Sequence, residues 1–227
     1  MQSASMVKEG IPFVLLFLIP GLILGFLGYW TGSGLWLLWG GAGLCVLLSA
    51  FMAFFFRDPE RSTPPDSDVI VSPADGRVLI VERIEPKEAN SAVQVSIFLS
   101  PLDVHINRSP MAGEIIGFDY RPGAFHIASR RIASVENEQN IVTVRGEKVT
   151  IVFRQIAGIL ARRLVFWKRV GEHVDMGERI GLMKFSSRMD VLMPGEFDVL
   201  VKPGDRVTGG VTIIGRLRNS NADQTGE

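Results

Sequence analysis

The chain of 227 residues has one cysteine and three histidines, and it carries almost no charge before residue 57. The single cysteine, Cys45, cannot form an internal disulfide and excludes a metal site built from several cysteines. The histidines are scattered without a ligand spacing, so no metal is expected. Lysine plus arginine balances aspartate plus glutamate, 24 against 24, with no basic cluster, so no nucleic-acid partner is expected.

The 47 residues from Gly10 to Phe56 contain no charged residue and no histidine. Two apolar runs in this segment, about residues 11–30 and 35–56, are each long enough to cross the hydrocarbon core of a bilayer as a helix. A cleaved signal peptide and buried core helices are the alternatives, but the apolar core of a signal peptide needs only about half this length. Buried helices in a small domain would rarely be uncharged on every face over such a length. We therefore expect a two-helix transmembrane hairpin at the N-terminus.

Basic residues flank the open ends of this hairpin, with Lys8 before the first run and Arg57 and Arg61 after the second. Positive charge beside a membrane-spanning segment favours the cytoplasmic side. Both ends, and the part of the chain that follows, are therefore expected on the cytoplasmic side of the cell membrane.

After Phe56 the sequence becomes polar and then alternates short Val- and Ile-rich runs with Gly, Pro and Asp. Runs of this length and composition are typical of β-strands joined by turns. The clearest are residues 69–71, 77–81, 93–99, 141–144 and 149–153. The segment 154–167 suits either a short helix or a strand. A mostly β domain is therefore expected after the hairpin.

A weak internal repeat marks the C-terminal part of this domain. The pattern Gly-x-x-Val-x-x-Gly occurs at residues 171–177 and again at 204–210. Such glycines suit tight hairpins that need positive φ, and the valine between them would pack inward. Paired hairpins of this kind resemble the flattened β-sandwich of biotinyl and lipoyl domains, which is the fold class expected here.

The expected domain organisation follows from these changes in composition. It comprises a membrane hairpin at 1–56, a juxtamembrane linker at 57–68, a β domain at 69–217 and a polar, disordered tail at 218–227.

The stretch most informative for chemistry lies between the two repeats and contains Ser186 and Ser187. A Ser-Ser pair is usually a polar turn, because a hydroxyl needs a base and an orienting partner to become a nucleophile. His105 offers a base near neutral pH, in a loop dense in polar residues that follows an apolar run. Asp75 could orient a histidine, although an aspartate in such a turn often only bonds its own backbone. Spacing alone does not show that these residues meet.

Two other histidines compete for the role of base. His126, in the segment Arg-Pro-Gly-Ala-Phe-His, is the alternative to His105. His173 lies inside the first repeat, in the middle of a turn, and is expected to be solvated.

Six motifs in one order along the chain carry a family resemblance: FFRDPER (55–61), SPADGRV (72–78), FLSPLDVHINRSP (98–110), ENE (136–138), QIAGILARR (155–163) and GERIGLMKFSSRMDVLMP (177–194). Together they resemble the short form of phosphatidylserine decarboxylase, a self-processing, pyruvoyl-dependent membrane enzyme. The resemblance runs from about Phe55 to Leu217, and an N-terminal membrane hairpin also belongs to the short members. Each motif alone is weak, but six in order are specific.

The resemblance implies that the chain is a proenzyme that cuts itself between Ser186 and Ser187. Ser187 would attack the carbonyl of Ser186, and elimination and hydrolysis would leave a β chain ending at Ser186 and an α chain that begins with a pyruvoyl group. That covalent cofactor, derived from Ser187, would form a Schiff base with the substrate. By the same resemblance His105 is the base and Asp75 its orienter, with His126 as the alternative base.

The implied reaction is the decarboxylation of phosphatidylserine to phosphatidylethanolamine and CO2. The implied partners are this lipid, the membrane and the chain's own α and β chains, and a homo-oligomer is left open. One departure is Ser186, because the family commonly has glycine there, so an unprocessed, degenerate homologue is one alternative. A membrane-tethered biotinyl- or lipoyl-like adaptor without catalysis is the other.

Overall fold

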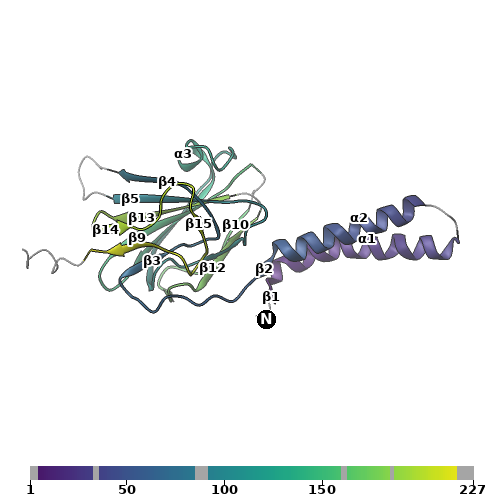
Figure 1. The fold of residues 1–227 in the computed structure, drawn as a ribbon, viewed down its shortest axis with the longest axis horizontal. Helices are drawn as coiled ribbons and strands as arrows, with labels where there is room; N and C mark the ends of the chain where they lie inside the picture. The colour runs from purple at the N-terminus through teal and green to yellow at the C-terminus, as the bar shows by residue number, and fades with distance from the viewer. Residues whose placement is uncertain (1–4, 33–35, 85–91, 160–162, 185–186, 219–227) are drawn as a thin grey trace, which may run out of the picture. The chain divides into compact units, whose positions relative to one another are not determined.

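The computed structural model describes residues 5–32, 36–84, 92–159, 163–184 and 187–218. The chain divides into two compact units, Met1–Glu60 and Arg61–Glu227. The first unit holds the apolar hairpin and the second holds most of the strands (Figure 1). The prediction of a mostly β protein with two N-terminal apolar helices is confirmed.

The hairpin consists of α1 (Ile11–Trp30) and α2 (Trp36–Phe55), which lie side by side (Figure 1). A single 3-10 turn at Lys8–Gly10 precedes α1. Both helices are long and apolar enough to cross a membrane. Many of their large apolar side chains, such as Leu16 and Leu22, are exposed, as lipid-facing residues would be.

Small residues contribute much of the contact between the two helices, together with Met52 and Phe55 near the end of α2. Gly21 and Gly28 of α1 are buried, as are Ala42 and Ser49 of α2. The Ser49 hydroxyl donates a hydrogen bond of 3.0 Å to the carbonyl of Val14 across the interface. Small side chains let two helix backbones approach closely where no hydrophobic effect drives them together. Gly21 and Gly28 therefore allow α1 and α2 to approach closely at these positions.

Two short strands close the open end of the hairpin, where a linker was expected from residue 57. β1 (Ser5–Met6) pairs antiparallel with β2 (Arg57–Asp58). The rings of Phe13 and Phe56 stack beside them, with centroids 5.3 Å apart. The first residues after α2 are therefore paired strand, because the segment before α1 supplies a partner for them.

The glycine contact in the hairpin predicts a cross-link. A Cβ added at Gly21 would lie 3.0 Å from the Cβ of Cys45, which is the chain's only cysteine, and a disulfide needs about 3.5–4.5 Å. Gly21→Cys, oxidised in lipid vesicles, should therefore form an intramolecular disulfide after a small shift. The measurement is the number of thiols that remain open to alkylation, by mass.

Gly43→Cys is the matched control, because a Cβ at Gly43 meets nothing within 4 Å. It should keep two free thiols within each chain under the same oxidation. Equal cross-linking of both variants would contradict the described helix contact.

The second unit contains a short helix, α3 (Ala133–Glu136), and a series of strands. The strand bounds are β3 (Val69–Val71), β4 (Gly76–Ile84), β5 (Ala92–Leu99), β6 (Ile106–Arg108), β7 (Gly113–Arg121), β8 (Gln139–Arg145), β9 (Thr150–Ile156), β10 (Leu164–Phe166), β11 (His173–Val174), β12 (Arg179–Met183), β13 (Ser187–Pro194), β14 (Phe197–Val199), β15 (Arg206–Val207) and β16 (Ile213–Leu217). Eight of them form one sheet in the order β11-β7-β8-β9-β13-β5-β4-β15. Two smaller sheets run in the orders β10-β12-β6 and β14-β16-β3.

β13 lies inside the eight-stranded sheet, paired antiparallel with β5 on one side and β9 on the other. Its side chains alternate between the two faces, as a strand requires. Met189, Val191 and Met193 are fully buried and belong to the main hydrophobic core. Arg188 and Asp190 therefore lie on the opposite face, where they are also buried.

The two copies of the sequence repeat form the two edges of this sheet. β11 pairs with β7, and β15 pairs with β4. The outer glycines of both copies have positive φ, 91° and 79° in the first and 97° and 73° in the second. Val174 and Val207 between them are buried, as expected. The repeat thus marks two similar turns that end the sheet on opposite sides.

The segment 154–167, for which helix and strand were both open, is strand where it is regular. Its start completes β9 and its end contains β10. Of the expected C-terminal tail, residues 219–227 lie outside the described residues.

Candidate active site

Ser187 is the first residue of β13 and is fully buried. Within the part of the chain that the structure describes, its Oγ has no hydrogen-bond partner. Leaving a buried polar group unpaired costs about 1–3 kcal/mol, so such a hydroxyl requires an explanation. Ser186, the other serine of the pair, lies outside the described residues.

Three neighbouring strands bring the candidate residues to one end of the sheet. Ser187 begins β13 opposite Leu99, the last residue of β5. His105 lies in the loop that leaves β5 after Leu99, and Asp75 directly precedes β4, the next strand of the sheet. Because these strands are antiparallel, the start of β13, the end of β5 and the start of β4 all meet at this end. The sequence motifs far apart in the chain are thus gathered by strand order.

The imidazole of His105 is buried and held in one orientation. Its Nδ1 lies 2.9 Å from the backbone carbonyl oxygen of Asp103, and its backbone carbonyl accepts a hydrogen bond from the N–H of Met183. A carbonyl oxygen can only accept, so Nδ1 carries the hydrogen. In the neutral ring the lone pair is therefore on Nε2, which is the form that a general base requires.

The hydrogen bonds that the structure describes for the Asp75 carboxylate have partners other than His105. Its carboxylate accepts from the Arg61 guanidinium at 2.8 Å and from the backbone N–H of Gly209, also at 2.8 Å. Both partners fix the turn before β4 to the second repeat and to the start of the unit. The role of Asp75 as the orienter of His105 stays a prediction, and one described contact that orients the His105 ring is its hydrogen bond to the Asp103 carbonyl.

The other two histidines lie at the surface. The His126 Nε2 pairs with the Glu136 carboxylate at 3.0 Å, and both side chains are about half exposed. His173 is exposed on β11. An exposed imidazole next to a carboxylate is a common surface ion pair, so burial distinguishes His105 from both.

A buried ion pair anchors β13 directly after Ser187. Arg188 donates from Nε to Asp190 at 2.6 Å and from Nη2 to Ser96 of β5 at 2.7 Å. Asp190 in turn accepts from Ser134 of α3 at 2.6 Å and from Gln94 of β5 at 3.2 Å. Neither charged side chain is more than 1% exposed. The first side chain after Ser187 is therefore tied directly to β5 and, through Asp190, to α3.

Arg154 of β9 lies opposite Asp190 in the strand ladder. Burial lowers the pKa of its guanidinium, and the positive charges of Arg121 and Arg188 lower it further, while Asp190 raises it. Asp190 therefore faces two guanidinium groups, that of Arg188 in a direct ion pair and that of Arg154 across the strand ladder. Removing its charge would leave both guanidinium groups poorly compensated.

Sequence reasoning did not single out Arg188 and Asp190 as a pair. Their alternation with the apolar residues 189, 191 and 193 would have placed them on one face of a strand. What the sequence did not reveal is that this second face is also covered, which turns two ordinary surface charges into a buried pair.

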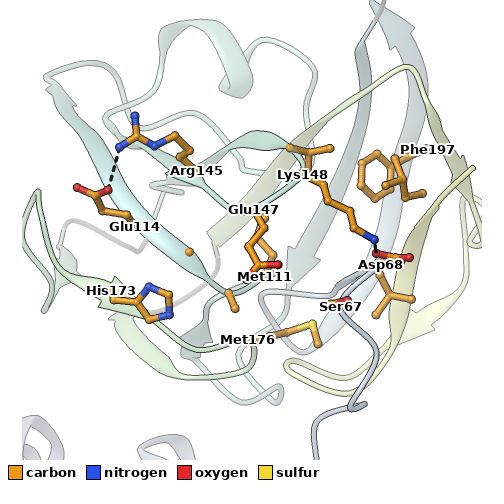
Figure 2. A pocket seen from close by; sticks show the side chains of 16 residues that line it. Ser67, Asp68, Met111, Glu114, Arg145, Glu147, Lys148, His173, Met176 and Phe197 are labelled. Carbon is orange, nitrogen blue, oxygen red and sulfur yellow. Dashed lines mark hydrogen bonds and ion pairs between the residues drawn. The ribbon is translucent and has the colours of Figure 1, made fainter.

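The larger of two described cavities, about 430 Å3, lies apart from these residues (Figure 2). Its floor is apolar, with Met111 and Phe197 among its lining, and Figure 2 shows Lys148 reaching Asp68 and Arg145 reaching Glu114 at the rim. The hydrogen bond to Asp68 raises the pKa of Lys148. Ser187, His105 and Asp75 do not line it.

A second cavity, about 390 Å3, is lined by residues that contact the candidate residues or lie near them in the chain. Its lining includes Arg61, which donates a hydrogen bond to Asp75, and Arg108, the last residue of β6. The backbone N–H of Arg108 donates to Pro73 in the turn that contains Asp75. This cavity is lined by charged groups of both signs.

Comparison with known proteins decides the family. The family model described as phosphatidylserine decarboxylase matches residues 48–215. The chain belongs to this family. The match begins within α2 and ends within β16, and it contains Asp75, His105 and Ser187.

Three curated relatives support the assignment, each named phosphatidylserine decarboxylase proenzyme. The protein from Solibacter usitatus is 52% identical over 75% of this chain and 81% of its own length. Those from Symbiobacterium thermophilum and Magnetococcus marinus are 42% and 37% identical over 96% and 97% of this chain, and over 98% and 99% of their own lengths. The similarity to the last two extends through the apolar hairpin.

The buried pair generates a stability prediction. Asp190→Asn should lower the free energy of unfolding by about 3–5 kcal/mol, because it leaves Arg188 buried without a countercharge. Denaturation in detergent, followed by circular dichroism, measures this in the Ser187→Ala background, where every variant is expected to stay one chain.

Glu114→Gln is the matched control, since its ion pair with Arg145 is about half exposed. It should cost less than about 1 kcal/mol. Similar losses for the two variants would mean that burial of the Arg188–Asp190 pair carries no special weight.

Proposed function

We propose that this protein is a self-cleaving proenzyme whose mature form decarboxylates phosphatidylserine to phosphatidylethanolamine with a pyruvoyl group derived from Ser187. The observation that carries the proposal is Ser187 itself, a buried, unpartnered hydroxyl within the described residues, at the first position of a central strand. Membership in the decarboxylase family supplies the reaction class.

Self-cleavage would begin with loss of the Ser187 hydroxyl proton to a base as Oγ attacks the carbonyl carbon of Ser186. The C–N bond then breaks, the amine of residue 187 takes up a proton, and an ester joins the two parts. Loss of the Cα proton of residue 187 breaks the Cβ–Oγ bond and frees the carboxylate of Ser186. Addition of water and departure of ammonia from residue 187 leave the pyruvoyl group.

His105 is the base we assign to the first step. It is buried at the sheet end where Ser187 lies, and the Asp103 carbonyl holds its Nδ1 hydrogen, so the Nε2 lone pair can accept a proton. Asp75 would support the charged histidine from the neighbouring turn. His126 is a weaker candidate because its ring pairs with Glu136 at the surface.

The pyruvoyl group supplies an electron sink, which takes up the charge that develops as a carboxylate leaves an amino acid. Its position at residue 187 fits the described surroundings. A ketone is smaller than a serine side chain plus an amine, and it has no hydrogen to donate. A buried site without a hydrogen-bond partner therefore costs a ketone less free energy than it costs a hydroxyl.

The cut chain would stay assembled through its sheets. The 41 residues from Ser187 to Glu227 contain β13, β14, β15 and β16. β13 is paired with β5 and β9, β15 with β4, and β16 with β3, all from the part before the cut. The two products would therefore remain one folded unit without a covalent link.

The apolar hairpin would anchor the enzyme in the cell membrane, with both of its ends on the cytoplasmic side. Lys8 and Arg57 at these ends support that orientation. Anchoring confines the catalytic unit to the surface that contains its lipid substrate.

Release of labelled CO2 tests the proposed reaction. The purified full chain, mixed with phosphatidylserine labelled in its carboxyl carbon in detergent micelles, should release label, whereas Ser187→Ala should release none. Ser67→Ala, at an exposed serine of the separate cavity, should retain full activity. No release by the wild-type chain would refute the proposed reaction.

The serine before the cut generates a second prediction. Glycine lacks the Cβ beside the attacked carbonyl and adopts a wider range of backbone angles. If this lowers the strain in the transition state of the attack by about 1.4 kcal/mol, cleavage becomes about tenfold faster. Ser186→Gly should therefore cleave faster than wild type in a quenched time course after cell-free synthesis. Ser187→Gly, which lacks the nucleophile, should remain whole, and a slower Ser186→Gly would show that Ser186 does not hinder the reaction.

A further inference from the structure

Three buried amide side chains form a hydrogen-bonded chain beside β13. Asn140 of β8 donates from Nδ2 to Gln155 Oε1 at 2.9 Å, and Gln155 of β9 donates from Nε2 to Asn107 Oδ1 at 2.8 Å. None of the three is more than 4% exposed. The chain crosses from the eight-stranded sheet to β6 of a smaller sheet.

A backbone carbonyl fixes the direction of this chain. Gln155 Nε2 also lies 3.3 Å from the carbonyl oxygen of Val165, which can only accept. The nitrogen of the Gln155 amide must therefore face Val165 and Asn107, and its oxygen must face Asn140. Asn107 consequently turns its oxygen to Gln155 and its Nδ2 away from it.

Asn107 Nδ2 is thus a donor without an acceptor. It is buried, and the described part of the protein offers it no hydrogen-bond partner. Turning the amide over would place two nitrogens against each other at Gln155, so the chain keeps the donor in this orientation. A buried N–H group without an acceptor lowers the stability of the fold. Such a group is explained if it donates a hydrogen bond to an oxygen during the reaction.

The strand register places this donor near Ser187. Gln155 lies directly opposite Met189, and Ser187 is two residues before Met189 on the same face of β13. Diagonal neighbours of this kind are about 7–8 Å apart between strands. Asn107 is in contact with Gln155 and is two residues beyond His105 on the chain.

We propose that Asn107 Nδ2 donates a hydrogen bond to the oxygen that becomes negative when Ser187 Oγ attacks the preceding carbonyl, with Gln155 as the residue that orients it. This inference rests on the proposed self-cleavage. In that step the Oγ–C bond forms, the Oγ proton goes to the base, and the π electrons of the carbonyl move onto its oxygen. A preoriented donor in a buried site stabilises this charge without reorganisation.

The test is the cleavage rate after cell-free synthesis in detergent, quenched and read by intact mass. Asn107→Asp keeps the acceptor for Gln155 but replaces the donor, and Asn107→Leu removes the donor without adding charge. Both should slow cleavage by about 100-fold or more. Gln139→Glu is the matched control, a buried amide changed to an acid on the opposite face of the sheet, and it should cleave within about threefold of wild type.

Hydroxylamine adds a readout that loss of folding would not produce. It cleaves esters, so it would cut any chain that has passed the first step and stopped there. Folded Asn107 variants, with circular dichroism like that of wild type, should resist it because they form no ester.

Cleavage of a folded Asn107 variant at the wild-type rate, or its accumulation as a hydroxylamine-sensitive ester, would overturn the inference alone. If one variant fails to fold, the other decides. A wild-type chain that never cleaves would overturn both the inference and the proposed function.

Discussion

The structure depends on β13, a central strand of the eight-stranded sheet that is also the proposed start of a new chain. Its pairing with β5 and β9 fixes Ser187 at the sheet end where the loop containing His105 leaves β5. The buried Arg188–Asp190 pair anchors this end of β13 to β5 and α3. Without such an anchor, the first residues of a strand that begins at a cut would be expected to fray.

The polar groups around this strand lie on both faces of the sheet. On one face Arg188, Asp190 and Arg154 form a charged network, while on the other Asn107 and Gln155 belong to a chain of amides. Burying so many polar groups stabilises a fold poorly compared with apolar packing, because each must be desolvated. Their placement next to a buried serine agrees with the proposed reaction, because functional sites commonly depart from optimal packing.

Much of this could be predicted from the sequence, and the limits have physical reasons. The apolar runs predicted the helices because crossing a bilayer requires length and lack of charge, and the repeat predicted its positive-φ glycines because few other residues adopt that conformation. The motifs predicted the family, which the comparisons confirm. The Arg188–Asp190 pair and the orientation of Asn107 depend on strand register and on what covers each face, and neither is encoded locally. The short strand at Arg57–Asp58 was missed for the same reason, since its partner precedes α1.

The central claim is that the chain cuts itself at the first residue of β13 and converts that residue into a reactive ketone. Intact mass spectrometry of the purified, denatured protein, before and after treatment with an amine and cyanoborohydride, tests it most directly. We predict two chains divided between Ser186 and Ser187, the smaller one about 17 Da lighter than its sequence mass and increased in mass by the amine. A single chain of 227 residues that does not react with the amine would contradict it.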